Sequence, residues 1–499
     1  MFTMRTAFRT LLVSIHVATV LAGPLLPRAS EPDPSLAQSV TVGGRTFVNK
    51  GLVAFGLIPS NFRESTGDTM GGIGSAIAIQ PGSFVAQPNG SYTGTLIVQP
   101  DRGFNVDGTV DYQGRHHQLD FVLNPHYDTS ALEFTAAQQT LQLTYKVTTL
   151  YTERGGGTTT GLDATGVRDA QSGFPSDPLA DPQMPIPKKE DNRLTLDLEG
   201  LVLNEDGTFW SSDEYGPYIY HFDASGALIQ AIQPPDAIIP ITDGDIDFES
   251  ENDPDTGRAG NKGFEGLTID KATSTLYAML QTATIQDGGN KKSNSRYTRL
   301  LAYDVSSPTT VTPALKAEYI VPLPQDSDGK TLGSSEIAWV GGDIILALAR
   351  DGSGHGDDNA TSAYKGIDLV DFSSATNIAG SKFDSHKNAV APKGKLDKSV
   401  TPATYTPFVS LIDTTNLARF GLHNGDPVDQ TLIDAKWESI ALVRVGDPSS
   451  PDDFFLFTAS DNDFITTDGI MIGQPYNAGL DNDNQFLVWR VTLPGSTLP

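Results

Sequence analysis

Four segments of this chain share one pattern, in which a glutamate opens a short apolar strand, a turn follows, and a second strand ends in polar or charged residues. The openers are Glu199-Gly200-Leu201, Glu265-Gly266-Leu267, Glu336-Ile337-Ala338 and Glu438-Ser439-Ile440, and the second strands end at Trp210-Ser211-Ser212-Asp213-Glu214, Met279-Leu280-Gln281, Leu348-Ala349-Arg350-Asp351 and Thr458-Ala459-Ser460-Asp461. In an antiparallel pair the start of one strand lies beside the end of the next. Each repeat therefore places its glutamate beside a polar strand end, at one edge of its sheet.

The repeats predict an all-β fold, specifically a β-propeller whose sheets stand around one axis. The best-formed unit, residues 199–232, holds four strand-like runs separated by turns, which is the content of one propeller blade. No long segment has helical periodicity, so helices are expected to be minor. Six blades are predicted, with five or seven as open alternatives. A sandwich of two sheets is the other alternative, because periodicity does not reveal whether a ring closes.

Long loop insertions are expected between the repeats. The opening glutamates are irregularly spaced, and polar loops at 154–192, 243–262, 352–364 and 377–406 absorb the extra length. Gly71-Gly72-Ile73-Gly74-Ser75-Ala76 is a candidate blade start that lacks a glutamate. The last strand, Gln485 to Leu493, is expected to pair with N-terminal strands and seal the ring.

The beginning of the chain predicts secretion. Two arginines precede an apolar run at residues 11–21, and small residues end it, so residues 1–22 are predicted to be a signal peptide cleaved after Ala22. The run is too short to span a bilayer. Residues 23–40, which are rich in proline, are expected to form a flexible leader. Residues 41–499 are expected to form a single folded domain.

Composition argues against several partners and chemistries. The 499 residues include no cysteine, so thiolate metal sites and cysteine nucleophiles are absent. The net charge of −27 argues against nucleic-acid and anionic-membrane partners. Solubility explains most of this acidity, although part of it suits divalent cations, which prefer oxygen ligands. Sequons at Asn89 and Asn359 predict a glycoprotein, and a monomer is expected.

An ordered set of motifs extends over most of the predicted domain. The motifs are Asp197-Leu198-Glu199-Gly200, Ser212-Asp213-Glu214-Tyr215-Gly216-Pro217, Asn261-Lys262-Gly263-Phe264-Glu265-Gly266-Leu267, Leu300-Leu301-Ala302-Tyr303-Asp304, Ser335-Glu336-Ile337, Arg350-Asp351, Lys365-Gly366-Ile367-Asp368-Leu369, Lys436-Trp437-Glu438-Ser439 and Ser460-Asp461-Asn462-Asp463-Phe464. Together they resemble the phytase-like family, described as having esterase-like activity of phytase. The resemblance covers roughly residues 45 to 495. It implies a β-propeller and hydrolysis of phosphoesters or other esters. Ser439 departs from the glycine that the family pattern favours.

The predicted site is the mouth where the blade edges converge. Its catalytic candidates are Glu199, Glu265, Glu336 and Glu438; its substrate-binding candidates are Lys262, Arg299, Arg350 and Lys436; its metal candidates are Glu199, Glu214, Glu265, Glu336, Glu438, Asp461 and Asn462. Crowded carboxylates raise one another's pKa or recruit a cation. A divalent cation such as Ca²⁺ suits such ligands, and it would neutralise a phosphate and activate water. The alternative is structural, with each glutamate hydrogen-bonded to backbone amides of the next blade.

Three functions remain open from the sequence. The first is a secreted hydrolase that acts on small phosphoesters with a divalent cation. The second is a hydrolase of carboxylic esters or lactones that uses the same cation. The third is a non-catalytic extracellular binding propeller. No Gly-x-Ser-x-Gly elbow is present, which argues against an α/β-hydrolase serine esterase.

Overall fold

Strands dominate the computed structural model, which describes residues 31–104, 108–171, 180–308 and 311–498. The described helices are short: α1 (Phe134–Ala137), α2 (Thr414–Ala418), and the 3₁₀ helices η1 (Pro34–Leu36), η2 (Gln138–Thr140), η3 (Ile285–Asp287), η4 (Lys382–Asp384) and η5 (Pro392–Gly394). No helix in these ranges is both long and apolar enough to cross a membrane. The all-β prediction is confirmed.

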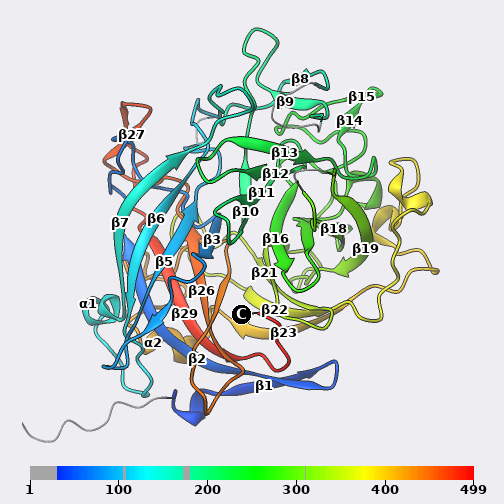
Figure 1. Ribbon diagram of the computed structural model, residues 1–499. Helices are drawn as coiled ribbons and strands as arrows, with labels where there is room; N and C mark the ends of the chain where they lie inside the picture. The colour runs from blue at the N-terminus through cyan, green and yellow to red at the C-terminus, as the bar shows by residue number, and fades with distance from the viewer. Residues whose placement is uncertain (1–30, 105–107, 172–179, 309–310, 499) are drawn as a thin grey trace, which may run out of the picture.

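Five antiparallel sheets stand around a common axis as the blades of a propeller (Figure 1). The first contains β3 (Ala76–Ile79), β5 (Tyr92–Gln99), β6 (Arg115–Leu123) and β7 (Leu141–Leu150), with β4 (Val85–Ala86) beside β5. The second contains β10 (Leu198–Leu203), β11 (Phe209–Asp213), β12 (Ile219–Phe222) and β13 (Leu228–Ile232). The third contains β16 (Phe264–Asp270), β17 (Thr275–Leu280), β18 (Tyr297–Asp304) and β19 (Ala314–Pro322). The fourth contains β20 (Gly333–Trp339), β21 (Ile344–Arg350), β22 (Lys365–Asp371) and β23 (Thr404–Ser410).

The fifth blade joins the two ends of the described chain. It contains β25 (Ala441–Arg444), β26 (Asp453–Asp461), β29 (Asn484–Thr492), β2 (Arg45–Ile58) and β1 (Gln38–Val42), and β24 (Lys436–Trp437) pairs with the end of β26. The pairing of β2 with β29 sets Phe55 opposite Leu487. The prediction that the last strand seals the ring with N-terminal strands is therefore confirmed, and the sandwich alternative is wrong.

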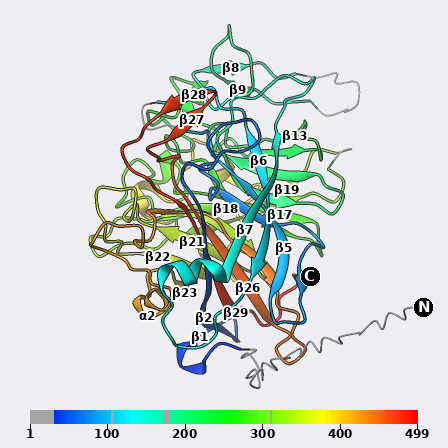
Figure 2. The same cartoon turned by 90° about the vertical axis from the view of Figure 1, so that its left-hand side faces the viewer.

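The prediction of six blades is wrong, because strands outside the repeats do not form a blade of their own. The N-terminal strands β1 and β2 complete the fifth sheet. The remaining strands form small hairpins within insertions: β8 (Gly166–Arg168) with β9 (Met184–Ile186), β14 (Ile241–Thr242) with β15 (Asp245–Ile246), and β27 (Gly469–Met471) with β28 (Gln474–Tyr476). Figure 2 shows β8–β9 and β27–β28 projecting beyond the ring.

Glycines allow the innermost strands of neighbouring blades to approach closely. A Cβ atom on Gly200 would lie 2.5 Å from Cβ of Leu267 in the next blade, and one on Gly266 would lie 2.8 Å from the backbone nitrogen of Ile337. Real Cβ atoms do not approach other atoms so closely. Packing at the axis therefore requires glycine at positions 200 and 266, whereas Ile337 and Ser439 follow the opening glutamates of the fourth and fifth blades.

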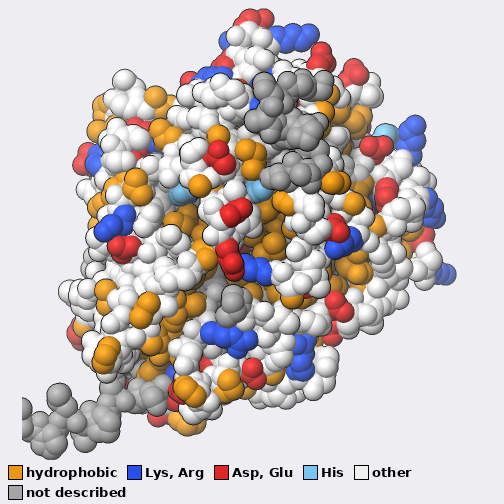
Figure 3. Space-filling view, viewed as in Figure 1, with side chains coloured by type: hydrophobic (Ala, Val, Ile, Leu, Met, Phe, Trp, Pro, Cys, Tyr) orange, Lys and Arg blue, Asp and Glu red, His pale blue; other side chains and the backbone are white. Residues whose placement is uncertain are grey.

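The core consists of apolar clusters between adjacent blades, such as the one that unites Trp210 and Ile219 with Leu276 and Leu301. At the end of the axis near the C-terminus, the innermost strands enclose an apolar cavity of about 420 Å³. Figure 3 shows apolar side chains gathered around the centre of that face. The innermost strands begin at the opposite end of the axis, where the mouth lies.

Residues 1–30, which hold the predicted signal peptide and residues 23–30 of the predicted leader, lie outside the described residues. The remainder of the predicted leader contains η1 and the start of β1. Glu31 lies 2.8 Å from Lys50 and 3.2 Å from Arg490, so ion pairs attach this segment to the fifth blade.

Candidate functional site

A cavity of about 350 Å³ opens at the mouth of the propeller. We call it the mouth cavity; it is lined by Asp101, Arg102, Asp197, Glu199, Glu214, Asn261, Glu265, Gln281, Arg350, Lys436, Glu438 and Asp463. Seven carboxyl groups thus face three cationic side chains. If each cation pairs with one carboxylate, the cavity still holds an excess of carboxylates.

Antiparallel pairing explains how these side chains meet. Glu199 lies in β10 and Glu265 in β16, near the mouth end of each innermost strand. Asp213 at the end of β11 is paired with Leu198, so Glu214 follows at the same edge as Glu199. Arg350 ends β21 in the fourth blade. The strand register therefore brings residues from separate blades to one rim.

The first acidic cluster contains Asp197, Glu199 and Glu214, each of which offers an oxygen within 4.8 Å of the others. Burial and the neighbouring carboxylates Glu265 and Glu214 hold the pKa of Glu199 well above its usual value. Burial also raises the pKa of Asp197, and Arg102, 3.3 Å away, opposes that rise. This cluster could bind a metal ion.

Glu214 and Glu265 form a pair of carboxyl groups from neighbouring blades. Burial and the charge of Asp197 raise the pKa of Glu214 to about 7, and the charges of Arg102 and Arg258 oppose the rise. Gln281 donates a hydrogen bond from Nε2 to Oε1 of Glu265. Oε1 of Glu214 and Oε2 of Glu265 are buried with no hydrogen-bond donor among the described residues. Each oxygen is therefore available to a proton or a cation.

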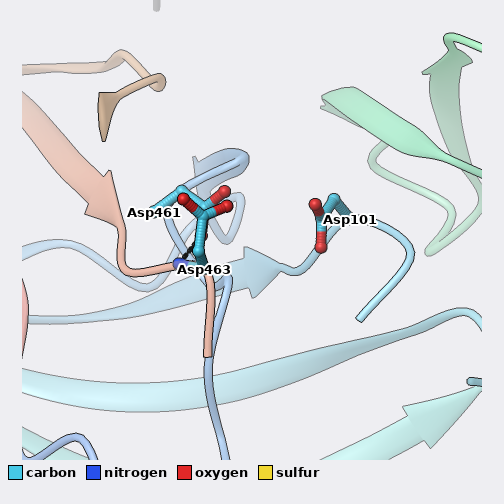
Figure 4. Close-up of side chains that lie close together, drawn as sticks. All are labelled: Asp101, Asp461 and Asp463. Atoms are coloured by element: carbon cyan, nitrogen blue, oxygen red, sulfur yellow. Dashed lines mark hydrogen bonds between the residues drawn. The ribbon is translucent and has the colours of Figure 1, made fainter. Parts of the chain in front are cut away.

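The second acidic cluster, Asp101, Asp461 and Asp463, brings together the end of β26 and the segment after β5 (Figure 4). The backbone nitrogen of Asp463 donates to Oδ1 of Asp461 over 2.7 Å. Nζ of Lys436 lies 2.6 Å from Asp461 and 2.8 Å from Asp463. Burial raises the pKa of Asp101, and the charges of Asp461 and Asp197 raise it further. Lys436 thus supplies the positive charge that this cluster requires.

Glu438 is compensated by two cations. Arg350 forms an ion pair with Oε1 of Glu438, and Nζ of Lys436 lies 3.6 Å from the same oxygen. Nε of Arg350 is buried without a hydrogen-bond acceptor in the described chain. These contacts place Arg350 and Lys436 on the wall of the mouth cavity.

Several residues predicted for the site lie elsewhere. Oε1 of Glu336 accepts hydrogen bonds of 2.8 Å from the backbone amides of Leu267 and Ile337, which is the structural alternative stated above. Arg299 is fully buried between Asp287, at 2.9 Å, and Glu318, at 2.6 Å. Neither side chain is available to a ligand at the mouth.

Two further predicted residues are also displaced from the mouth cavity. Oδ1 of Asn462 accepts from the amides of Gly72 and Phe464, over 2.9 and 3.0 Å, and its Nδ2 donates to the carbonyl of Asn482. Its side chain therefore ties loops together. Lys262 lines a neighbouring cavity instead of the mouth cavity.

Sequence reasoning missed Asp101, Arg102, Asp197 and Asp463. Asp197 and Asp463 lie within motifs that carried the resemblance, so their place in those motifs could have identified them as site candidates. Asp101 and Arg102 follow the second strand of the first blade. They occupy the place that Glu214 holds in the second blade. That equivalence was obscured because the first blade has no opening glutamate.

Comparisons with known proteins agree with the sequence motifs. The family model described as "Phytase-like: Esterase-like activity of phytase" matches residues 90–464. A protein of Arthroderma benhamiae, described as an uncharacterized secreted protein, is 36% identical over 493 residues, which cover 92% of this chain and 95% of that protein.

Solved structures give weaker similarities. A luciferin-regenerating enzyme has a TM-score of 0.30 and 10% identity, covering 89% of this chain and 96% of its own. The PQQ-bound aldose sugar dehydrogenase from Streptomyces coelicolor has a TM-score of 0.23 and 11% identity, covering 59% and 94% respectively.

Proposed function

The chain belongs to the phytase-like family, and we propose that its mouth cavity hydrolyses ester bonds of small molecules, phosphoesters foremost, with a divalent cation held by buried carboxylates. The chain is secreted. The observation that carries the proposal is the pair of buried, unpartnered oxygens on Glu214 and Glu265 beside the cluster of Asp197 and Glu199.

The residues of the mouth fit a hard divalent cation. Asp197, Glu199, Glu214 and Glu265 offer only oxygen ligands, as Ca²⁺ and Mg²⁺ prefer. Burial and the neighbouring carboxylates raise the pKa values of these groups, which favours a counter-ion when they ionise. Calcium is the ion that we propose. When bound, such an ion neutralises phosphate charge and polarises the scissile bond.

The protein's own groups supply proton transfer and orientation. With a pKa of about 7, Glu214 can hold or release a proton near neutral pH, as a general acid or base requires. Glu265, whose pKa is raised by burial and by the charge of Glu214, can accept that proton. Arg350 and Lys436, on the cavity wall, can donate hydrogen bonds to ester or phosphate oxygens.

The test compares hydrolysis by the purified protein with added Ca²⁺ and with a chelator. Release of inorganic phosphate from phosphomonoesters, lost with chelator and restored by Ca²⁺, is the expected result. Native mass spectrometry of the same samples measures metal content independently of turnover. Failure to hydrolyse a broad panel of esters, with ligand binding retained, would favour a non-catalytic binding propeller.

Hydrolysis of carboxylic esters or lactones is the second candidate. Each cation of the mouth already faces a carboxylate: Arg102 faces Asp197, Arg350 faces Glu438, and Lys436 faces Asp461. The remaining negative charge repels an anionic substrate and not a neutral one. Cleavage of neutral esters without phosphate release would support this candidate.

The remaining sequence predictions fit this proposal and stay predictions. We propose a signal peptide at residues 1–22, a leader at 23–40 and one propeller domain at 41–499, acting as a monomer. The side chains of Asn89 and Asn359 are exposed, as glycosylation requires.

A further inference from the structure

A second polar cavity of about 280 Å³ lies beside the mouth cavity and shares Gln281 and Arg350 with it. We call it the lysine pocket; it is lined by Lys262, Gln281, Thr282, Lys292, Ser295, Asp326, Lys330, Thr331, Leu332, Gly333, Ser335, Arg350, Asp351 and Gly352. These residues belong to the third and fourth blades and the loops next to them. Four cationic side chains face two carboxylates there, in a chain whose net charge is −27.

The two carboxylates of the lysine pocket are already satisfied by local donors. Asp326 accepts from the backbone amides of Asp328 and Lys330, at 2.9 and 2.8 Å. Asp351 accepts from the Ser362 hydroxyl at 2.7 Å, and also from backbone amides including that of Ala363 at 2.6 Å. Both carboxylates therefore stabilise the conformation of their own loops.

The cations of the lysine pocket, in contrast, retain hydrogen-bond donors that no carboxylate satisfies. Neither Lys262 nor Lys292 forms an ion pair with a carboxylate in the part of the chain that the structure describes. Lys330 has one weak contact, 3.6 Å from Asp328, and both side chains are largely exposed. Nε of Arg350, in the shared wall, is buried without an acceptor. Unpaired cations in a cavity bind anions through charge-assisted hydrogen bonds.

We propose that the lysine pocket binds a second anionic group of the substrate, apart from the ester bond that lies in the mouth cavity. The preferred substrates are then esters that carry a further phosphate, sulfate or carboxylate. This proposal rests on the proposed function. It also explains how an anionic substrate overcomes the repulsion of the mouth, because the lysines attract the part that does not react.

A binding measurement without turnover tests the pocket itself. Inorganic phosphate is titrated into the chelator-treated full-length protein by isothermal titration calorimetry. The double variant Lys262→Met and Lys292→Met is compared with Lys146→Met, which removes one charge from an exposed position on β7 in the first blade. Saturable binding by the native protein and the control is expected, with affinity at least about tenfold lower in the double variant. Absent native binding, or equal affinity in the double variant, would overturn the proposal.

Kinetics then connect the pocket with the substrate. The ratio of kcat/KM for an ester with a second anionic group to that for its neutral analogue is measured, with separate phosphate, sulfate and carboxylate arms. The double variant should lower this ratio about tenfold, mainly through KM, and Lys146→Met should not change it. An unchanged ratio would overturn the subsite while leaving the proposed function standing. Absence of turnover on every ester, with phosphate binding intact, would instead overturn the proposed function and leave the anion site established.

Discussion

Burial and the charge of Glu214 raise the pKa of Glu265, although the two residues come from neighbouring blades. Two buried carboxylates that repel each other are stable when one of them carries a proton or when a cation compensates their charge. Both conditions depend on pH and on metal, which makes the pair the most informative place for mutation.

Replacing Glu265 by Gln should abolish activity while leaving the fold intact. The amide has nearly the same shape and keeps an acceptor for Gln281, but it can neither ionise nor accept the proton of Glu214. We expect kcat to fall about 100-fold or more, and Tm to change by no more than about 3 °C. Steady-state kinetics and calorimetric unfolding give the two readouts. Normal activity of the folded variant would show that Glu265 is structural.

Calcium should stabilise the protein more as the pH rises from 5 to 8. Carboxyl groups with a raised pKa, such as Glu214 at about 7, favour folding at low pH and lose that contribution as pH rises through the folded pKa. A bound cation replaces the lost proton. The increase in Tm on adding Ca²⁺ to chelator-treated protein should therefore grow with pH.

The histidines with a lowered pKa act in the opposite direction, because His116, His117 and His355 favour folding as pH rises. Their contribution is the same with and without Ca²⁺, so the difference in Tm removes it. A Ca²⁺ effect that is equal at pH 5 and pH 8 would argue against a cation at the ionised cluster.

Glu336 should stabilise the fold and take no part in catalysis. Its buried Oε1 accepts two backbone hydrogen bonds, one from Leu267 in the third blade and one from Ile337 in its own. Glu336→Ala leaves two buried amides without acceptors and should lower the free energy of unfolding by about 2–5 kcal/mol.

The matched control is Glu336→Gln, which keeps an acceptor and should cost about 1 kcal/mol or less. Urea denaturation measures both variants, and activity is expressed per folded molecule. A folded Glu336→Gln variant with a large loss of kcat would contradict the structural role.

The sequence predicted the blades wherever a glutamate opens the innermost strand. The first blade was poorly recognised, because its start is fixed by Gly74, where a Cβ atom would lie 2.1 Å from the backbone of Ser460. The blade number could not be read from the sequence, since strand content does not show whether a hairpin belongs to a blade or to an insertion. β8–β9 and β27–β28 are such hairpins.

The site was predicted only in outline, because the strand pattern does not reveal where each side chain points. Strand register predicts that an opening glutamate lies at the mouth edge, but it does not predict the direction of its side chain. Glu199 and Glu265 line the cavity, whereas Glu336 points to backbone amides between blades. Arg299 was assigned from its charge and its place beside the motif that begins at Leu300, but its two carboxylate partners, Asp287 and Glu318, lie outside the motifs.

Lys436 should determine how many cations the mouth binds. Its ammonium group lies within 2.8 Å of both Asp461 and Asp463, where a metal ion would otherwise balance their charge. Lys436→Met leaves buried carboxylates uncompensated and should destabilise the chelator-treated protein by about 3–5 kcal/mol. Added Ca²⁺ should restore much of that loss by binding at the second cluster with Asp101. Titration calorimetry should then show one ion bound by the native protein and two by the variant. Lys436→Arg, which keeps the positive charge, should behave like the native protein. A variant that binds no additional ion would show that these aspartates cannot form a metal site even without their lysine.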